Sequence, residues 1–281
     1  MGICLLDISG LMYRAFYGTP SMKYNDSEVG ALFGFCSEII NLISIFNNSY
    51  FIAALDCSKK TFRNDLYPEY KANREDMPKE LLQQCPLIQE ACEQFGFKVI
   101  KKQGYEADDI IATCVKHFHT CDVVTVVSGD KDLLQLLQYN NVKVYNPSKH
   151  RYITEKDVFE KFGVMPNQLL DLFSLMGDAS DNIPGIPGIG PKTASKLITQ
   201  YQTLDNLISD LSQLPASKLT QKIRENIDKA MLSKKLIKLY YSVDLDFDLN
   251  NESANYFNII DFLTKYRFNS LLKRLKQRHI T

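Results

Sequence analysis

Three short apolar segments in the first half of the chain each lead into an aspartate. The segments are residues 3–6, 51–55 and 123–127. They lead into Asp7, Asp56 and, after Ser128 and Gly129, Asp130. Helical stretches separate them, and strands that alternate with helices predict a mostly parallel α/β sheet. Because ligands bind outside the carboxyl ends of the strands in open sheets of this type, we expect the three aspartates to gather along one edge.

A simpler explanation exists for each aspartate taken singly. Aspartate often follows a strand because it favours turns and the N-caps of helices. That accounts for one strand, but three strands with further acids close behind favour a shared site.

The pattern of elements changes at about residue 150. Before it, further strands are expected at 97–100 and 142–145, with helices at 32–46, 81–95 and 108–117. After it, only helical segments are expected, at 155–162, 168–176, 192–201, 218–241 and 257–276, with an acidic linker at 244–255. We therefore predict an α/β domain over residues 1–165 and a helical region over residues 166–281.

The net charge is zero, with 33 basic and 33 acidic residues, which argues weakly against a nucleic-acid binder. Basic side chains are nevertheless concentrated in two of the expected helices. Residues 265–278 hold six and no acid, and residues 218–238 hold seven against Glu225 and Asp228. Such runs are typical of a nucleic-acid-binding surface and equally of a solvated helix face. These two interpretations stay open.

Cysteine usage and hydropathy indicate a cytoplasmic protein. The seven cysteines are odd in number, have no CxxC spacing, and form no zinc-ligand pattern with the four histidines. Reduced, mostly buried thiols are the expectation. No apolar run approaches the length of a membrane span, and the N-terminus does not resemble a targeting peptide.

Three further acidic segments follow the strands. They contain Glu106, Asp108 and Asp109, then Asp130 and Asp132, then Asp178 and Asp181. Acids at helix starts are also favoured by capping and by the helix dipole. Capping does not explain convergence, because carboxylates that gather repel one another and must be neutralised.

Divalent cations neutralise such a cluster, and Mg²⁺ prefers oxygen ligands. Two ions about 4 Å apart can activate a water molecule and stabilise the leaving oxygen of a phosphodiester. Rival phosphate chemistries lack their motifs, since there is no GxxxxGK[ST] and no DxD after the first strand. The acids therefore predict a metal-dependent phosphate site.

The sequence IPGIGPKTA at residues 186–194 is the most specific short motif. Gly188 and Gly190 permit positive φ and close backbone approach. Lys192 and Thr193 would open the following helix, whose N-terminus suits a phosphate. The pattern is typical of a helix-hairpin-helix turn, which positions a duplex without reading its sequence. A plain turn between two packed helices is the alternative.

A polar segment dense in charge and tyrosine runs from Lys59 to Lys79. It separates a strand from a helix by more residues than a plain connection needs. We expect a functional loop or a short helical insertion here.

Taken together, five stretches resemble a known family. They are YRAFY, KTFRNDLYPEYKANREDMP, GYEADDIIAT, SGDKDLLQL and LMGDASDNIPGIPGIGPKTASKL. The chain resembles the 5′-nuclease domain of bacterial DNA polymerase I and its stand-alone relatives, the bacterial and phage 5′–3′ exonucleases and flap endonucleases. The resemblance covers residue 1 to about 275, with the motifs in family order.

The resemblance implies a PIN-like central sheet and assigns nine carboxylates to metal binding. Those nine are Asp7, Asp56, Glu106, Asp108, Asp109, Asp130, Asp132, Asp178 and Asp181. The first Mg²⁺ ion would be held mainly by Asp7, Asp56, Glu106 and Asp108. The second would be held by Asp130, Asp132, Asp178 and Asp181. Mn²⁺ is expected to substitute for Mg²⁺.

The resemblance also assigns the DNA contacts. The polar insertion becomes a helical arch at about 59–80, in which Lys71 and Arg74 contact the scissile phosphate. Tyr70 is expected to stack on a base, and Arg14 and Arg63 match further DNA-contacting positions. The glycine turn lies in a helix-3-turn-helix motif at about 170–202, which implies a K⁺ ion near residues 185–190.

The expected activity is hydrolysis of phosphodiesters at 5′ flaps, nicks and 5′ ends of DNA, including attached RNA primers, in replication and repair. We expect a monomer, either a separate nuclease or the excised nuclease part of a polymerase I, which works with a DNA polymerase. Two alternatives remain: a non-catalytic binder of DNA structures and a PIN-like ribonuclease.

Overall fold

The computed structural model describes residues 2–47, 49–57, 60–120, 122–247 and 257–278. Its centre is a six-stranded sheet in the order β5-β4-β1-β6-β7-β8. The strands are β1 (Gly2–Asp7), β4 (Ser49–Ala54), β5 (Lys98–Ile100), β6 (Val124–Val127), β7 (Val142–Asn146) and β8 (Arg151–Ile153). All pair in parallel except β8, which runs antiparallel to β7. The expected mostly parallel α/β sheet is confirmed.

Strand β1 lies in the middle of the sheet, and its side chains alternate between two cores. Ile3 and Leu5 enter the core that contains helix α6 (Ala107–Phe118). Cys4 and Leu6 enter the core on the other face. A strand buried on both faces needs a continuous apolar run, which explains the sequence ICLL.

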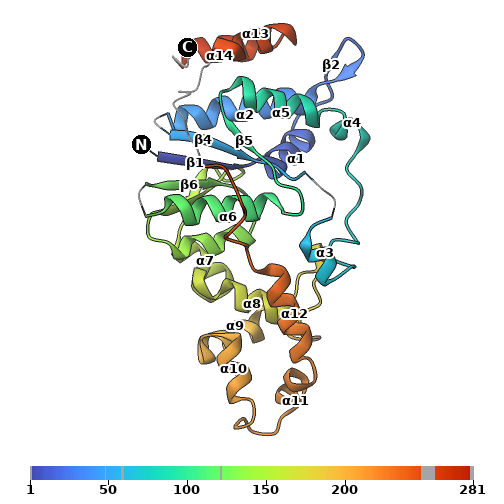
Figure 1. Cartoon of the computed structure of the whole chain (residues 1–281), viewed down its shortest axis with the longest axis vertical. Coiled ribbons are helices and arrows are strands. Elements are labelled where there is room, and N and C mark those ends of the chain that lie inside the picture. The colour runs from blue at the N-terminus through green and yellow to red at the C-terminus, as the bar shows by residue number, and fades with distance from the viewer. Residues whose placement is uncertain (1, 48, 58–59, 121, 248–256, 279–281) are drawn as a thin grey trace.

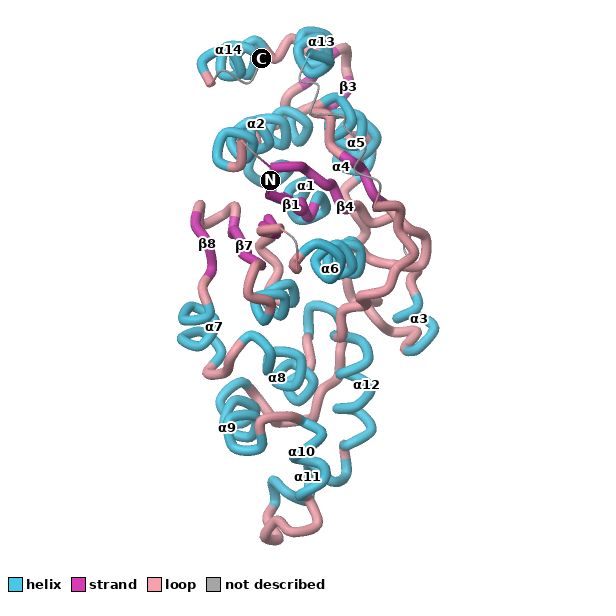
Figure 2. Tube along the Cα trace, turned by 60° about the vertical axis from the view of Figure 1, so that its left-hand side comes forward, coloured by secondary structure: helices cyan, strands magenta, loops and turns pink. Residues whose placement is uncertain are grey.

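Helices cover both faces of the sheet (Figure 2). Those of the second core are α1 (Ile8–Gly18), α2 (Gly30–Ile45), α5 (Cys85–Gln94), α13 (Phe257–Lys265) and α14 (Asn269–Gln277). A two-stranded hairpin, β2 (Lys23–Tyr24) and β3 (Ser27–Glu28), precedes α2. Between β4 and α5, residues 60–84 form the expected insertion, with the short helices α3 (Phe62–Leu66) and α4 (Lys79–Leu82). Residue 59, its expected first residue, lies outside the described part.

Residues 155–237 form a helical region below the sheet (Figure 1). It contains α7 (Glu155–Phe162), α8 (Leu169–Met176), α9 (Pro191–Tyr201), α10 (Leu204–Asp210), α11 (Lys218–Glu225) and α12 (Ile227–Ile237). Of the 3₁₀ helices described, η1 (Asp132–Gln138) lies between β6 and β7, η2 (Pro166–Gln168) precedes α8, and η3 (Ala179–Asp181) follows α8. Buried residues of α8, α9 and α12 belong to the same core as α6, so the two regions share one hydrophobic core.

Two expected long helices are each divided. Residues 218–241 form α11 and α12, because Asn226 leaves helical geometry and its side-chain amide donates to the Lys222 carbonyl at 2.9 Å. Residues 257–276 form α13 and α14, because Arg267 takes a left-handed φ of 58°. The expected linker at 244–255 lies largely outside the described residues.

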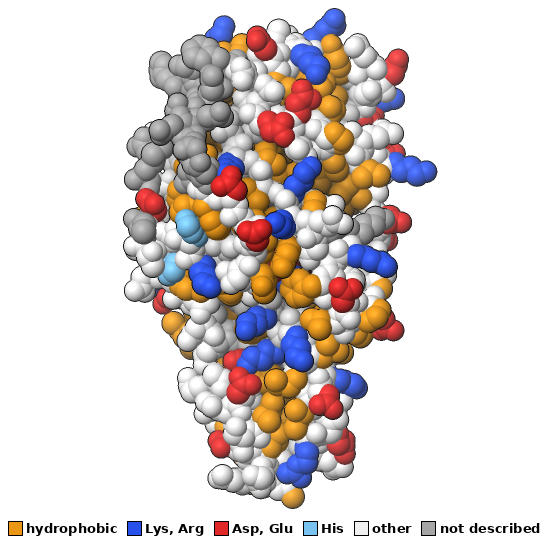
Figure 3. Space-filling model, viewed as in Figure 1, with side chains coloured by type: hydrophobic (Ala, Val, Ile, Leu, Met, Phe, Trp, Pro, Cys, Tyr) orange, Lys and Arg blue, Asp and Glu red, His pale blue; other side chains and the backbone are white. Residues whose placement is uncertain are grey.

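The last two helices also correct the expected extent of the helical region. Helices α13 and α14 pack on α5 and α2, at the end of the molecule opposite α9–α11 (Figure 1). Arg274 of the basic run bonds Ser37 Oγ at 2.7 Å and Asn41 Oδ1 at 2.7 Å, both on α2. Figure 3 shows acidic and basic side chains interspersed over one face of the molecule. Through Arg274, part of the basic run therefore stabilises the packing of α14 on α2.

Elements that the pattern did not predict have weak signals. Helix α1 contains Gly10 and ends at Gly18, and glycine lowers helix propensity. Strand β8 is a short edge strand with two exposed residues, so it carries little apolar pattern. Among the described residues, no helix is both long and apolar enough to cross a membrane.

Candidate active site

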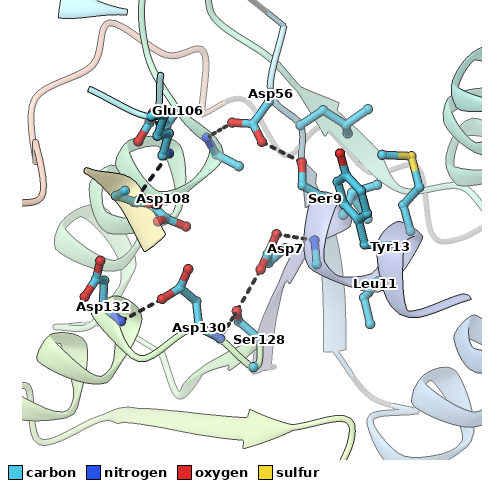
Figure 4. Close-up of a pocket in the computed structure, with 18 of the residues that line it drawn as sticks. Asp7, Ser9, Leu11, Tyr13, Asp56, Glu106, Asp108, Ser128, Asp130 and Asp132 are labelled. Atoms are coloured by element: carbon cyan, nitrogen blue, oxygen red, sulfur yellow. Dashed lines mark hydrogen bonds and ion pairs between the residues drawn. The ribbon is translucent and has the colours of Figure 1, made fainter. Parts of the chain in front are cut away.

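A cavity of about 660 Å³ opens at the carboxyl ends of β1, β4 and β6. Its lining includes seven of the nine predicted carboxylates, namely Asp7, Asp56, Glu106, Asp108, Asp130, Asp132 and Asp181. Figure 4 shows six of them around a common space. In the sheet, β1 has β4 on one side and β6 on the other, so its end is the crevice where ligands bind in open α/β sheets.

Asp7 and Asp56 are held by groups that orient their oxygens. Asp7 ends β1 and caps α1, accepting hydrogen bonds from the Gly10 N–H at 3.0 Å and from Ser128 Oγ at 2.7 Å. Asp56 accepts from Ser9 Oγ at 2.6 Å and from the Ala107 N–H, at the start of α6, at 2.8 Å. Burial raises the pKa of Asp7 to about 6, with smaller contributions from the charges of Asp130 and Asp56.

Helix α6 supplies the next two acids. Glu106 is its N-cap and Asp108 lies in its first turn, where the helix dipole favours negative charge. Burial raises the pKa of Asp108 well above its usual range, and the nearby charges of Asp130 and Asp7 raise it further. A cation among these groups would relieve both effects.

Asp132, Asp178 and Asp181 form the tightest carboxylate group among the described residues. One oxygen from each lies within 4.8 Å of the others. Asp132 Oδ1 is buried and has no hydrogen-bond partner. Burial, followed by the charge of Asp130, raises the pKa of Asp132 to about 8. Three converging carboxylate oxygens with an unsatisfied buried atom fit a hard divalent cation.

Lys71 and Arg74 contact acids that line the cavity. Lys71 Nζ lies 2.7 Å from Glu106 Oε1, and Arg74 Nε donates to Asp181 Oδ1 at 3.0 Å. The Lys71 N–H also donates to the Asp181 carbonyl at 2.9 Å, which ties the insertion to η3. The structure therefore brings both predicted phosphate-contacting residues to the carboxylates.

Lys131 is a further basic residue that sequence reasoning did not single out. Its Nζ lies 2.7 Å from Asp178 Oδ2. Although burial opposes the shift, this contact lowers the pKa of Asp178. The position of Lys131 between Asp130 and Asp132 is the sequence feature that could have identified it as a site residue. Tyr13 was also missed: it lines the cavity beside Arg14, in the quoted stretch YRAFY (Figure 4).

Two predicted roles are wrong for Asp109 and Arg63. Asp109 is 0% exposed and does not line the cavity. Both its oxygens accept from the Arg63 guanidinium, at 2.6 and 2.8 Å. Because Arg63 is 2% exposed, its side chain is not placed to contact DNA. Asp109 points away from the other acids because it lies one residue after Asp108 on the helix, about 100° further around it.

Tyr70 is not placed for base stacking. Its side chain is 5% exposed, and its hydroxyl donates to Glu106 Oε2 at 3.1 Å. Arg14 remains a candidate DNA contact, since it is partly exposed at the cavity while Nη1 lies 3.1 Å from Glu38 Oε1.

The glycine turn lies between α8 and α9, within the expected motif at 170–202. Gly188 has a φ of 76°, and Gly190 is the N-cap of α9. Lys192 and Thr193 stand in the first turn of α9, and Lys192 is exposed. A Cβ on Gly188 would lie 2.7 Å from Lys222 Nζ, so this lysine of α11 reaches over the turn.

Two family descriptions together match most of the chain. Residues 2–163 match the 5′-3′ exonuclease N-terminal resolvase-like domain, and residues 164–258 match the 5′-3′ exonuclease C-terminal SAM fold. A 5′-3′ exonuclease of Bacillus subtilis is 40% identical over 86% of this chain and 84% of the relative. DNA polymerase I of Rhizobium leguminosarum is 41% identical over 97% of this chain, which spans only 28% of that protein.

Solved structures show the same fold. The chain matches a bacteriophage T5 flap endonuclease, crystallised with DNA and metal ions, with a TM-score of 0.72 and 23% identity over 99% of this chain and 98% of the other. The catalytic core of Rad2 in complex with DNA matches with a TM-score of 0.62 and 14% identity over 98% and 91%. This chain belongs to the 5′-3′ exonuclease family of hydrolases.

Proposed function

We propose that this chain hydrolyses phosphodiesters near the 5′ ends of DNA, at flaps, nicks and the junctions of RNA primers. The observation that carries the proposal is the carboxylate cavity at the end of β1, with Lys71 and Arg74 beside it. Family membership supplies the 5′ polarity. A relative of similar length is named a 5′-3′ exonuclease, and longer relatives are DNA polymerases, which supports a role beside a polymerase.

The proposed cofactor is Mg²⁺, bound as two ions, with Mn²⁺ able to substitute. Asp7, Asp56, Glu106 and Asp108 would hold one ion. The other would be held by Asp130, Asp132, Asp178 and Asp181. Bound there, the ions would lower the pKa of a coordinated water and stabilise the developing charge on the phosphate. Asp109 is left out of both groups because Arg63 occupies its oxygens.

The protein's own cations have a separate role. In the metal-free protein Lys71 and Arg74 neutralise Glu106 and Asp181. With metal ions neutralising those acids, the ammonium and guanidinium groups would be available to a phosphate in the same cavity. Charged donors placed there stabilise the negative charge that develops as the phosphodiester is cleaved.

The turn at residues 185–190 would hold the duplex beside the cavity. Backbone N–H groups at the start of α9 suit a phosphate, and Lys192 and Lys222 add positive charge. The proposed K⁺ ion would be held at this turn by backbone oxygens near residues 185–190.

Cleavage of a labelled 5′-flap substrate with Mg²⁺, and none with EDTA, is the expected result. Asp130→Ala should lower the rate by on the order of 10²–10³-fold while flap binding persists, because this acid would hold a metal ion and would not contact the DNA. Asp210→Ala removes an exposed acid outside the cavity and should change nothing. If the wild type shows no metal-dependent cleavage, the nuclease assignment is refuted and a DNA-structure binder is favoured.

Lys71→Ala should lower the single-turnover rate by on the order of 10²-fold with only a modest loss of flap affinity, since its charge acts mainly as the phosphate reacts. Alanine keeps the Cβ at φ 57°, so no new backbone strain arises. Lys79→Ala, at an exposed site on α4, is the matched control. Equal losses of rate and affinity would contradict the assigned role.

The stability of the metal-free protein should fall as the pH rises from 5 to 9. The folded-state pKa values of Asp7 and Asp132 are about 6 and about 8, above the usual value near ~4. Their contribution to stability is therefore present at low pH and is lost as the pH rises through these values. Thermal unfolding in EDTA measures this, and stabilisation by Mg²⁺ should grow over the same range.

The control for that experiment is Asp132→Asn, which should remove the upper part of the decline, near pH 8. A flat profile in EDTA would show that these two carboxylates are not destabilised in the folded protein.

Gly188→Ala should weaken duplex binding and abolish its dependence on K⁺. The φ of 76° disfavours a side chain, and the new Cβ would displace Lys222 Nζ. Duplex affinity is compared in KCl and LiCl at equal ionic strength. Gly18→Ala, where a Cβ meets nothing within 4 Å, is the control. If the wild type binds equally in both salts, no K⁺ ion mediates the contact.

A further inference from the structure

The buried guanidinium of Arg63 is bonded on every side. Two of its nitrogens donate to Asp109 at 2.6 and 2.8 Å. Its Nε donates to the Leu236 carbonyl at 2.7 Å, and Nη2 also donates to the Lys238 carbonyl at 3.2 Å. Nη1 lies 3.4 Å from Glu106 Oε2. Such a set fixes the guanidinium in one position, because arginine donors have a rigid planar geometry.

Asp109 is bonded as completely as its partner. Beside the two bonds from Arg63, Oδ1 accepts from the Tyr240 N–H at 2.9 Å and Oδ2 accepts from the Glu106 N–H at 3.2 Å. The pair therefore joins three segments that are far apart in sequence: α3 at the base of the insertion, α6 with Glu106 and Asp108, and the chain that leaves α12 at residues 236–240.

Helix α12 extends this connection to the glycine turn. Ser233 is fully buried, and its Oγ accepts from the Gly185 N–H at 3.0 Å. Ser233 and Leu236 are three residues apart on α12, a rise of about 4.5 Å along the helix. One helical turn thus separates the contact with the glycine turn from the contact with Arg63.

We propose that the Arg63–Asp109 pair and Ser233 act as a spacer that fixes the distance between the duplex-binding turn and the carboxylate cavity. They are positioning residues, which touch neither metal nor DNA. The inference rests on the proposed function, in which the duplex is held at the turn and cut at the cavity. With that distance fixed, one phosphodiester at a set number of nucleotides from the duplex is presented for cleavage.

The chemistry of the pair explains why conservative changes should loosen the spacer. Lysine at position 63 keeps the charge but cannot bond Asp109 and both carbonyls together. Removing the Ser233 hydroxyl leaves the buried Gly185 N–H without its partner. Either change removes one contact of α12 while leaving all the cavity carboxylates, Lys71 and Arg74 in the chain.

The first measurement maps the cleaved phosphodiesters on a labelled 5′-flap substrate with Mg²⁺. We expect Arg63→Lys and Ser233→Ala to spread cleavage over phosphodiesters adjacent to the wild-type position. Turnover should fall on the order of ten- to a hundredfold, because a displacement of about 1 Å can cost that much. Flap affinity in Ca²⁺ should change little.

The control separates positioning from stability. Leu271→Ala lies in the core under α14, away from the spacer, and is assayed at temperatures giving the same folded fraction as the two variants. It should leave the cleavage position unchanged. Spreading in this control, or unchanged positions in both spacer variants, would overturn the proposal.

The second measurement needs neither metal nor DNA. Spin labels at Lys196 on α9 and Glu93 on α5, in a background whose accessible cysteines are replaced by serine, report the distance between the two regions. The spacer variants should broaden this distance distribution, and Leu271→Ala should not. If the wild type does not cleave DNA, the proposed function fails, and the distance distributions alone decide whether the spacer exists.

Discussion

Repulsion among carboxylates is the constraint to which the rest of the structure responds. Seven acids line one cavity, and burial raises the pKa of Asp7, Asp108 and Asp132 among them. Serine hydroxyls and backbone N–H groups hold Asp7 and Asp56, while Lys71, Arg74 and Lys131 neutralise acids on the other sides. Lys71 and Arg74 belong to the insertion between β4 and α5, and their ion pairs with the acids hold the insertion against the cavity. The carboxylates that would bind metal ions therefore also position the proposed phosphate-contacting residues.

The sheet makes this concentration of charge possible. Parallel strands end at a common edge, where β1 ends in Asp7 and the short segments after β4 and β6 contain Asp56 and Asp130. The helical region contributes Asp178 and Asp181 from the other side, through the turn after α8. Because the two regions share a core through α6, α8 and α12, the two sources of carboxylate are fixed relative to one another. A site divided between two regions needs this rigid connection.

The sequence allowed the sheet to be predicted, and strand-ending acids and family motifs pointed to eight carboxylates that the structure places at or beside one cavity. It misled at Asp109, Arg63 and Tyr70, which lie in matching motifs but are buried against one another and against Glu106. A motif specifies residue types and their spacing but not the direction in which each side chain points. Here that direction depends on long-range packing between residues 63, 109 and 236. The basic run at 265–278 could not be interpreted from the sequence alone, because Arg274 serves the packing of α14 on α2.

The alternation of side chains along β1 has a consequence for how the molecule unfolds. Ile3 and Leu5 belong to one hydrophobic core, while Cys4 and Leu6 belong to the other. Neither core can come apart without exposing the side chains that β1 contributes to it, and displacing β1 also removes its side chains from the other core. The two layers are therefore expected to melt in one cooperative transition, although they are built from segments far apart in the chain.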